Sequence, residues 1–221
     1  MRQSVEYVRM ELQHSHPRKR GRPPKRPEDT LETRELLVRA GLEVLTEKGF
    51  AATGIDEVLK RVGVPKGSFY HYFDSKEAFG AALIDRYASY FGRKLERHFI
   101  DESMTPLDRL RAFVDDAQAG MARHNFCRGC LIGNLGQEMA ALPESFRERL
   151  NAVFDDWERR LARCLEAAQR DGQIPAAVDC TQQASFFWIG WEGAVLRAKL
   201  ERSAKPLDIF ARGFFAGLQR A

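Results

Sequence analysis

The chain has 221 residues, 44% of them hydrophobic, which is enough to bury a substantial core and excludes disorder throughout. Its net charge is +4, but residues 17–27 (PRKRGRPPKRP) carry six basic and no acidic side chains. Subtracting these six charges leaves the rest of the chain at −2, which excludes a uniformly basic coat and predicts that any polyanion is bound locally.

The sequence predicts neither a membrane span nor a secretion signal. The longest apolar-looking stretch, residues 185–196, is too short to cross a bilayer and contains Glu192. Residues 1–16 lack the continuous apolar segment and the small-residue cleavage site of a signal peptide. We therefore expect a cytoplasmic protein whose thiols are mostly reduced.

Residues 1–29 carry four prolines and no apolar helical stripe beyond the first dozen residues, which predicts a flexible arm. Within it, Arg20-Gly21-Arg22-Pro23 resembles an AT-hook, a short extended segment whose arginines lie in a narrow A·T-rich minor groove. We therefore expect Arg20 and Arg22 to contact DNA. The alternative is a nonspecific tether to phosphates.

Three helices are predicted within residues 30–75. Gly49 should end the first, whose apolar residues recur at helical spacing: Leu36, Leu37, Ala40, Val44 and Leu45. Thr53 is expected to cap the second, with Asp56 at the capping-box position and Gly63-Val64-Pro65 as the break. The third starts at Pro65 and has room for only about two turns before Asp74-Ser75.

Two short helices across a glycine-containing turn have the geometry of a helix-turn-helix, whose second helix enters the major groove of DNA. Spacing alone fits an ordinary helical corner equally well. From Ser75 onward the chain reads as further helices over residues 76–99, 105 onward, 131–141, 144–172, 181–202 and 206 to the C-terminus. No segment shows convincing strand alternation, so the fold class is expected to be all-α.

The stretch Thr53–Glu77 (TGIDEVLKRVGVPKGSFYHYFDSKE) strongly resembles the TetR family of bacterial repressors. The resemblance implies an N-terminal helix-turn-helix domain at 30–75 and a larger helical domain at 76–221 that binds a ligand and dimerises. It also implies a double-stranded DNA operator, a homodimer and a small-molecule inducer as partners. Repression is the commoner mode of the family.

The residues of the third helix divide into two sets. Phe69 and Phe73 are apolar and four residues apart, so they should plug the small three-helix core. Donors that should lie away from that face and meet phosphates or base edges are Lys66, Ser68, Tyr70, His71 and Tyr72. In TetR-like proteins the positions matching Lys66, Gly67, Ser68 and Tyr70 approach the groove, and those matching Thr53, Tyr72 and Lys76 contact phosphates. For Thr53 and Lys76, a helix cap and a solvated charge are the alternatives.

The last two helices carry more apolar side chains than one core stripe needs. In the family, these helices from two subunits form a four-helix interface. A dimer would also place two recognition helices on successive major-groove faces of a palindrome. The apolar side chains are Phe186, Phe187, Trp188, Ile189, Trp191, Val195, Leu196, Ile209, Phe210, Phe214, Phe215 and Leu218.

Cys127-Arg128-Gly129-Cys130 admits three interpretations: zinc ligands, a redox pair, or small buried hydrophobes. Zinc is the weakest, because a structural site needs four ligands and His124 is the only added candidate at suitable spacing. We expect no metal and no cofactor.

Three stretches together resemble a TetR subgroup that includes electrophile-sensing repressors of N-ethylmaleimide reductase and acrylate-responsive regulators: residues 64–80, 129–131 and 191–199. Cys130 aligns with the sensing cysteine of the former, and a lowered pKa or the nearby Arg128 would favour its thiolate. Cys127 departs from that pattern and leaves a disulfide switch open. Further pocket candidates, for which core or dimer interface is the alternative, are Phe113, Asn134, Trp188 and Trp191.

The sequence also bears on two other functions. An enzyme is not expected, because no nucleophile, base and orienting group form a recognisable set and no glycine-rich phosphate loop is present. An architectural DNA-binding protein that uses the AT-hook-like arm is the alternative, but it would not require the large helical domain. The sequence therefore predicts a regulator released from its operator by a small molecule, such as an electrophile or a small unsaturated acid.

Overall fold

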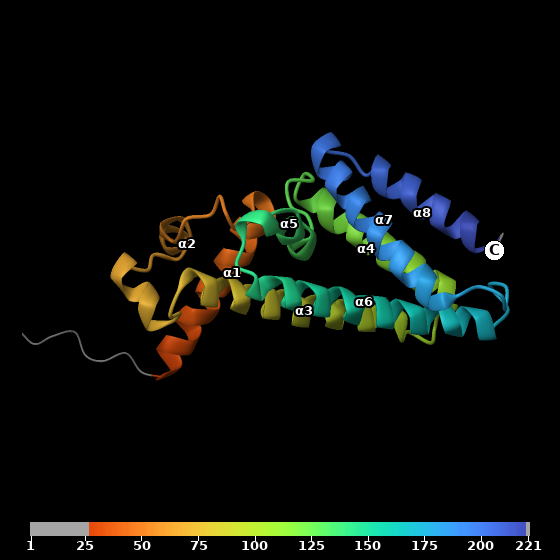
Figure 1. The fold of residues 1–221 in the computed structure, drawn as a ribbon, viewed down its shortest axis with the longest axis horizontal. Coiled ribbons are helices and arrows are strands. Elements are labelled where there is room, and N and C mark those ends of the chain that lie inside the picture. The colour runs from red at the N-terminus through yellow and green to blue at the C-terminus, as the bar shows by residue number, and fades with distance from the viewer. Residues whose placement is uncertain (1–26, 220–221) are drawn as a thin grey trace, which may run out of the picture.

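The computed structural model describes residues 27–219, and this part of the chain folds into helices with no β-strand, which confirms the all-α prediction (Figure 1). Helix α1 (Pro27–Lys48) is followed by α2 (Ile55–Val62), the short 3₁₀ helix η1 (Lys66–His71) and the long α3 (Lys76–Phe99). The remaining elements are α4 (Pro106–Arg123), α5 (Leu131–Gln137), the 3₁₀ helix η2 (Met139–Ala141), α6 (Ser145–Arg170), α7 (Cys180–Glu201) and α8 (Lys205–Leu218). None of the described helices is both long and apolar enough to span a membrane.

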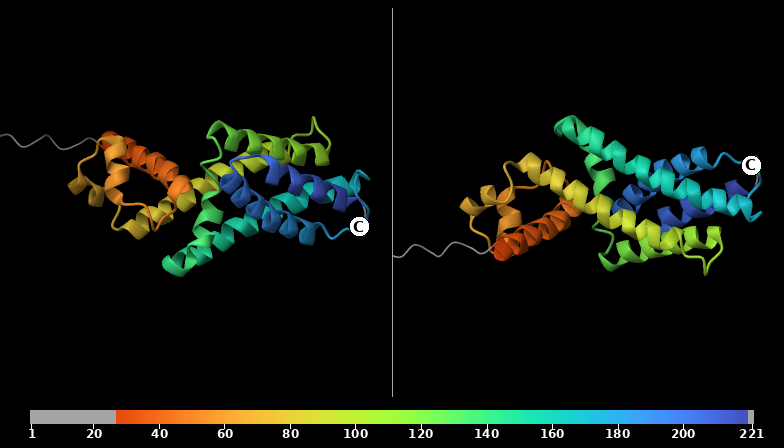
Figure 2. Two further views of the ribbon diagram at one scale, coloured as in Figure 1. Left: turned by 90° about the horizontal axis from the view of Figure 1, so that it is seen from above. Right: turned by 90° about the horizontal axis from the view of Figure 1, so that it is seen from below.

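The molecule is elongated, with α1, α2 and η1 at one end and the bundle of α4, α6, α7 and α8 toward the other (Figures 1 and 2). Helix α3 joins the two parts because it begins beside η1 and continues along α6. Its first turns pack so closely on α1 that a Cβ at Gly41 would overlap Phe79 and touch Leu83. A second junction is made by α5, which lies against both α1 and α6.

Local signals explain most of the helix ends. Gly49 and Gly63 adopt positive φ angles of 84° and 66°, a region that glycine enters without steric cost, and they end α1 and α2 as predicted. The predicted start of α4 is also confirmed, because Thr105 Oγ1 accepts a hydrogen bond from Asp108 N at 3.4 Å and Pro106 occupies the first turn.

Three local predictions are wrong. Helix α1 begins at Pro27, within the segment expected to be a flexible arm. Leu36 is exposed, because α1 turns its Leu37, Ala40 and Val44 side to the core instead. Thr53 does not cap α2: Gly54 stands at the N-cap, and the buried Thr53 hydroxyl donates to Gly49 O at 2.6 Å. The carbonyl of Gly49, just after the end of α1, lacks a helical partner and accepts the hydroxyl hydrogen of Thr53.

An aromatic cluster forms the centre of the bundle. Phe113 of α4 is fully buried and contacts Trp188 and Trp191 of α7 at ring-centroid distances of 5.7 and 6.1 Å. Phe91 of α3 and Trp157 of α6 extend the cluster, with ring centroids 4.5 Å apart. Burial of rings of this size contributes a large part of the hydrophobic stabilisation of the bundle.

Candidate functional site

The helix after the α2 turn is the candidate DNA-reading element. It is a 3₁₀ helix of six residues, shorter and tighter than a recognition α-helix. Phe69 and Phe73 are buried and meet Phe79 of α3 at ring-centroid distances of 5.5 and 4.7 Å. The prediction that these two phenylalanines plug the three-helix core is therefore confirmed.

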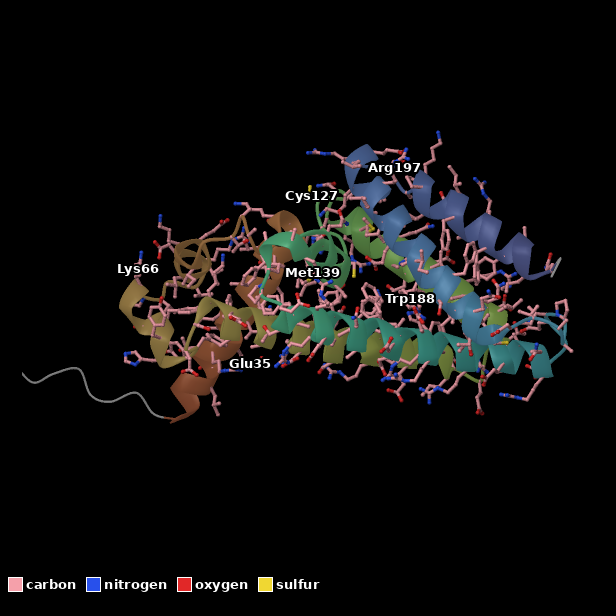
Figure 3. The ribbon with its side chains drawn as sticks, viewed as in Figure 1. Glu35, Lys66, Cys127, Met139, Trp188 and Arg197 are labelled. Carbon is pink, nitrogen blue, oxygen red and sulfur yellow. The ribbon has the colours of Figure 1, made fainter. Side chains whose placement is uncertain are left out.

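The opposite side of η1 is open to solvent. Tyr70 is 65% exposed, and Gly67 and His71 are exposed as well. A Cβ at Gly67 would meet no atom within 4 Å, so the fold itself does not require glycine there. A close approach to an external partner would explain it. Lys66 lies at the end of the molecule remote from α8 and pairs with Asp56 at 2.8 Å, which raises the pKa of its ammonium group (Figure 3).

The three expected phosphate-contacting residues lie closer to the protein interior. Tyr72 is partly buried against the core, so the expectation that its side chain lies away from the apolar face is wrong. Lys76 Nζ donates to Phe50 O at 3.0 Å and lies 4.6 Å from the centroid of the Phe50 ring. Thr53 is 3% exposed. Ser68 is partly buried, and Arg20 and Arg22 lie outside the described residues.

A cavity of about 250 Å³ opens around Cys130, between α3, α4 and α7. Its wall combines aromatic side chains with several titratable groups, which suits a small ligand that carries a polar group. The lining residues that matter below are Tyr87, Lys94, Arg123, His124, Arg128, Cys130, Trp191 and Glu192.

Cys130 stands at the N-cap of α5, where its Sγ accepts a hydrogen bond from Gly133 N at 3.5 Å. Burial raises the pKa of this thiol well above its ordinary value, and Glu192 raises it further. Arg128 does not offset this effect, because it pairs with Glu47 at 2.9 Å. Neither condition that would favour the thiolate is therefore met, and the raised pKa favours the thiol form.

The remaining sensing candidates are dispersed. Cys127 is exposed at the surface of the α4–α5 loop, its Sγ donating to Asn125 O at 3.6 Å, and it forms no disulfide with Cys130 (Figure 3). Trp191 lines the Cys130 cavity, whereas Trp188 lines a different hollow between α6 and α7. Phe113 is buried in the aromatic cluster. Among residues 27–219, no group of three or more His, Cys, Asp or Glu side chains could hold a metal ion.

Asn134 belongs to a junction between α5 and the end of α1 that the sequence did not reveal. Its Nδ2 donates to Thr46 O at 3.1 Å, and its Oδ1 accepts from Lys199 Nζ of α7 at 3.2 Å. Gly129 N also donates to Thr46 O, at 3.4 Å. The Asn134 side chain and the backbone of Gly129 thus both bind the last turn of α1.

Glu138 completes this junction at the other end of α5. Its carboxylate accepts hydrogen bonds from Phe50 N at 3.0 Å and from Ala51 N at 2.7 Å. Phe50 O in turn accepts a hydrogen bond from Lys76 Nζ. The backbone of Phe50 therefore connects Glu138 to the start of α3. Nothing local predicts this contact, because Glu138 and Phe50 are 88 positions apart.

Glu192 and Tyr87 were also missed as cavity residues. Glu192 stands within the most apolar stretch of the chain, and that isolation was a usable signal for a buried carboxyl. Tyr87 had no such signal, because tyrosine is common on half-buried helix faces.

Together, the exposed donor face of a helix-turn-helix and a second, cavity-containing helical bundle define the class of helix-turn-helix DNA-binding proteins. Comparison with known families places the class more closely. Residues 37–83 match "Bacterial regulatory proteins, tetR family", and residues 106–214 match "Tetracyclin repressor-like, C-terminal domain". The chain belongs to the TetR family of transcriptional regulators, as its sequence predicted, and this favours a regulator over an architectural DNA-binding protein.

Similar proteins support this assignment. The chain is 54% identical over 196 residues to the transcriptional regulator AcuR of Cereibacter sphaeroides, covering 89% of each chain. It is 33% identical over 177 residues to the transcriptional repressor NemR of Escherichia coli, covering 80% of this chain and 89% of the relative. A crystal structure of a TetR regulatory protein from Rhodobacter sphaeroides superposes with a TM-score of 0.81 at 55% identity, covering 82% of this chain and 96% of the other.

Proposed function

We propose that the chain is a homodimeric repressor that binds a palindromic operator and leaves it when a small molecule enters the Cys130 cavity. The observation that carries this proposal is the α5 junction, because it connects the wall of the cavity to the end of α1 in the DNA-binding part. Cys130 caps the first turn of α5, and Glu138 follows its last turn and binds the α1–α2 loop.

The DNA contacts are proposed from exposure and chemistry. Lys66, Tyr70 and His71 present donors to solvent at the end of the molecule, and Gly67 leaves room for close approach. Thr53, Ser68, Tyr72 and Lys76 would contribute at the edge of this surface, and Arg20 and Arg22 of the N-terminal arm would reach the minor groove.

Dimerisation is proposed through α7 and α8. Helix α7 exposes four large apolar side chains and α8 exposes one, and a monomer would leave them in water. A two-fold interface would bury this face against a second copy and present two η1 helices to one operator. The exposed side chains are Phe186, Ile189, Leu196, Leu200 and Ile209.

The inducer is proposed to be a small electrophile or a small unsaturated acid such as acrylate. The similarity to AcuR and NemR supports this class, and the cavity volume of about 250 Å³ suits a molecule of that size. Cys130 is the proposed sensing residue. If it adds to an activated alkene, its sulfur bonds the β-carbon and its thiol proton passes to the α-carbon, so no oxidant is needed. Trp191 would contact the ligand, because it lines the cavity. The other candidates do not line it and would act from outside the cavity wall: Cys127, Phe113, Asn134 and Trp188.

The proposal is tested by Tyr70→Ala in full-length protein, with operator affinity measured by fluorescence anisotropy. We expect operator binding to weaken at least tenfold, while the midpoint of thermal unfolding stays nearly constant because Tyr70 is exposed. Ile100→Ala is the matched control, since Ile100 is equally exposed at the far end of α3. Unaltered operator binding by Tyr70→Ala would remove η1 from the DNA interface.

Cys130→Ser tests the sensing residue separately. We expect an electrophile to release unmodified protein from its operator and to leave Cys130→Ser bound. Normal release of Cys130→Ser would show that the ligand acts reversibly and without the thiol.

A further inference from the structure

Glu192 is an acidic side chain on the inner side of α7, where it lines the Cys130 cavity. Its carboxyl group lies directly over Gly133 of α5: a Cβ at Gly133 would overlap Glu192 Oε2 and stand 3.8 Å from the Cβ of Cys130. The carboxyl group is therefore held between α5 and α7, beside the thiol. The residue as a whole is half-buried, and it also lines the hollow between α6 and α7.

No cation compensates for the burial of this carboxyl group within the described part of the chain. Burial raises the pKa of Glu192 to about 7, and the adjacent Cys130 only partly opposes the rise. The pKa values of the neighbouring Cys130 and Tyr87 are raised as well, by burial and by the nearby Glu192. Near neutral pH Glu192 thus exists in both protonation states.

The outer wall of the cavity is cationic. Lys94 pairs with Asp116 at 2.9 Å, and Arg128 pairs with Glu47 at 2.9 Å, so each keeps a nearby counter-charge. Arg123 lines the same cavity and forms no ion pair among residues 27–219. With Glu192 protonated, the wall carries a net positive charge and attracts an anion.

We propose that the cavity binds a small monocarboxylate together with one proton, which is held on Glu192. Two carboxyl groups in one cavity of this size cannot both be ionised without strong repulsion, so an entering anion favours the protonated form of Glu192. The proton also makes Glu192 a hydrogen-bond donor to the ligand's carboxylate. This inference rests on the proposed function only in that it concerns the same cavity.

Among the charges around Glu192, the acidic groups favour its protonated form, Lys94 and Arg128 are already paired, and Arg123 forms no ion pair among residues 27–219. On α6, Asp155 and Glu158 line the hollow that Glu192 also borders, and they disfavour a negative charge on Glu192. Lys199, one of two lysines near the site, is half-buried and already bonded to Asn134. The titratable and charged groups that face Glu192 are Tyr87 and Lys94 of α3, Arg123 and His124 at the end of α4, Arg128 and Cys130 before α5, Asp155 and Glu158 of α6, and Lys199 of α7.

The sign of the pH dependence follows from this linkage. Below about pH 7 Glu192 is already protonated, so a carboxylate binds with little proton uptake. Above that pH, binding must recruit the proton from solvent. Affinity should then fall by up to tenfold for each further pH unit, until the pKa of the bound state is reached.

Propionate is the probe, because it has the size and charge of acrylate but no alkene that could modify Cys130. Isothermal titration calorimetry of the full-length protein at pH 8, in two buffers with different ionisation enthalpies, counts the protons taken up per ligand. We expect close to one proton for the unmodified protein. For Glu192→Gln, which keeps a neutral hydrogen-bonding group, we expect binding with almost no proton uptake and a dissociation constant that is flat from pH 6 to 8.5.

Glu201→Gln is the matched control, since Glu201 is an exposed glutamate of the same helix and should leave the proton count unchanged. Circular dichroism checks that each variant is folded. A proton count near zero in the unmodified protein, or the same count in Glu192→Gln, would overturn the proposal. Tighter binding of the neutral propionamide than of propionate at pH 6 would also overturn the proposal. Operator release is measured in parallel, and a ligand that releases the operator without proton uptake would refute this inference but leave the proposed function standing.

Discussion

The junction between Glu138 and the α1–α2 loop makes a specific prediction about communication between the cavity and the DNA. Glu138→Ala removes the only carboxylate that the structure places on Phe50 N and Ala51 N within residues 27–219. It also removes the side chain that lies over Gly49, whose positive φ fixes the direction of the loop. We expect the variant to bind operator and ligand but to respond poorly to the ligand.

The size of the effect can be estimated from the contacts. Hydrogen bonds to a charged group contribute about 1.5–3 kcal/mol each, and partial exposure of Glu138 reduces this to about 2 kcal/mol for the pair. Allosteric coupling between two sites is ordinarily about 1–3 kcal/mol, or roughly 5–150-fold in affinity. Loss of this junction can therefore abolish most of the coupling while unfolding little of the protein.

The assay compares operator affinity with and without saturating ligand, by fluorescence anisotropy, in the unmodified protein and in two variants. The ratio of the two affinities should fall toward one in Glu138→Ala. It should be unchanged in Glu144→Ala, which removes an exposed glutamate whose one ion pair among residues 27–219 is with Arg147, three residues away. An unchanged ratio in Glu138→Ala would show that the signal does not pass through this contact.

Further predictions concern α5 and α7. Gly133→Ala should push the Glu192 carboxyl group aside and abolish proton uptake in calorimetry, without loss of stability, because alanine favours the helix by up to about 1 kcal/mol. Burial raises the pKa of Glu192 to about 7, so the folded protein holds this proton more tightly than the unfolded chain does. The free energy of unfolding, measured in urea, should therefore fall as pH rises from 5 to 8. The fall should be smaller in Glu192→Gln. Ile189→Glu, at a position 73% exposed, should convert a dimer to monomers in sedimentation velocity. Trp188→Phe removes a buried Nε1–H that has no partner among residues 27–219, so urea denaturation should show a change of no more than about 1 kcal/mol, against about 3–5 for Trp188→Ala.

The sequence predicted those features that depend on neighbouring residues. Gly49 and Gly63 end helices because their backbone conformation is local, and Thr105 caps α4 with a group three residues away. The spacing of Phe69 and Phe73 likewise defines one face of a helix, whatever lies beyond it. The family resemblance added the order of the two domains.

Predictions failed where another group, four residues away or in a distant segment, competes for a side chain. Thr53 has the right chemistry for a cap, but its hydroxyl donates a hydrogen bond to Gly49 O, four residues earlier in the chain. Arg128 was named as a group that would favour the Cys130 thiolate, but its guanidinium group pairs with Glu47 of α1, and the nearby Glu192 of α7 favours the thiol. The Thr53 contact is local and competes with capping, whereas the surroundings of Cys130 cannot be derived from spacing because they depend on how α1, α5 and α7 pack.

The raised pKa of Cys130 limits how this cavity can act as a sensor. A buried thiol is a weak nucleophile, so rapid reaction with an electrophile needs a base that accepts the thiol proton. Glu192 is suitably placed and, near pH 7, ionised in part of the molecules. The same ionised form repels a carboxylate, so neutral electrophiles and carboxylates should prefer opposite protonation states of one residue. A rate of Cys130 alkylation by N-ethylmaleimide that rises with pH through about 7, in parallel with weakening propionate binding, would follow from this shared dependence on Glu192.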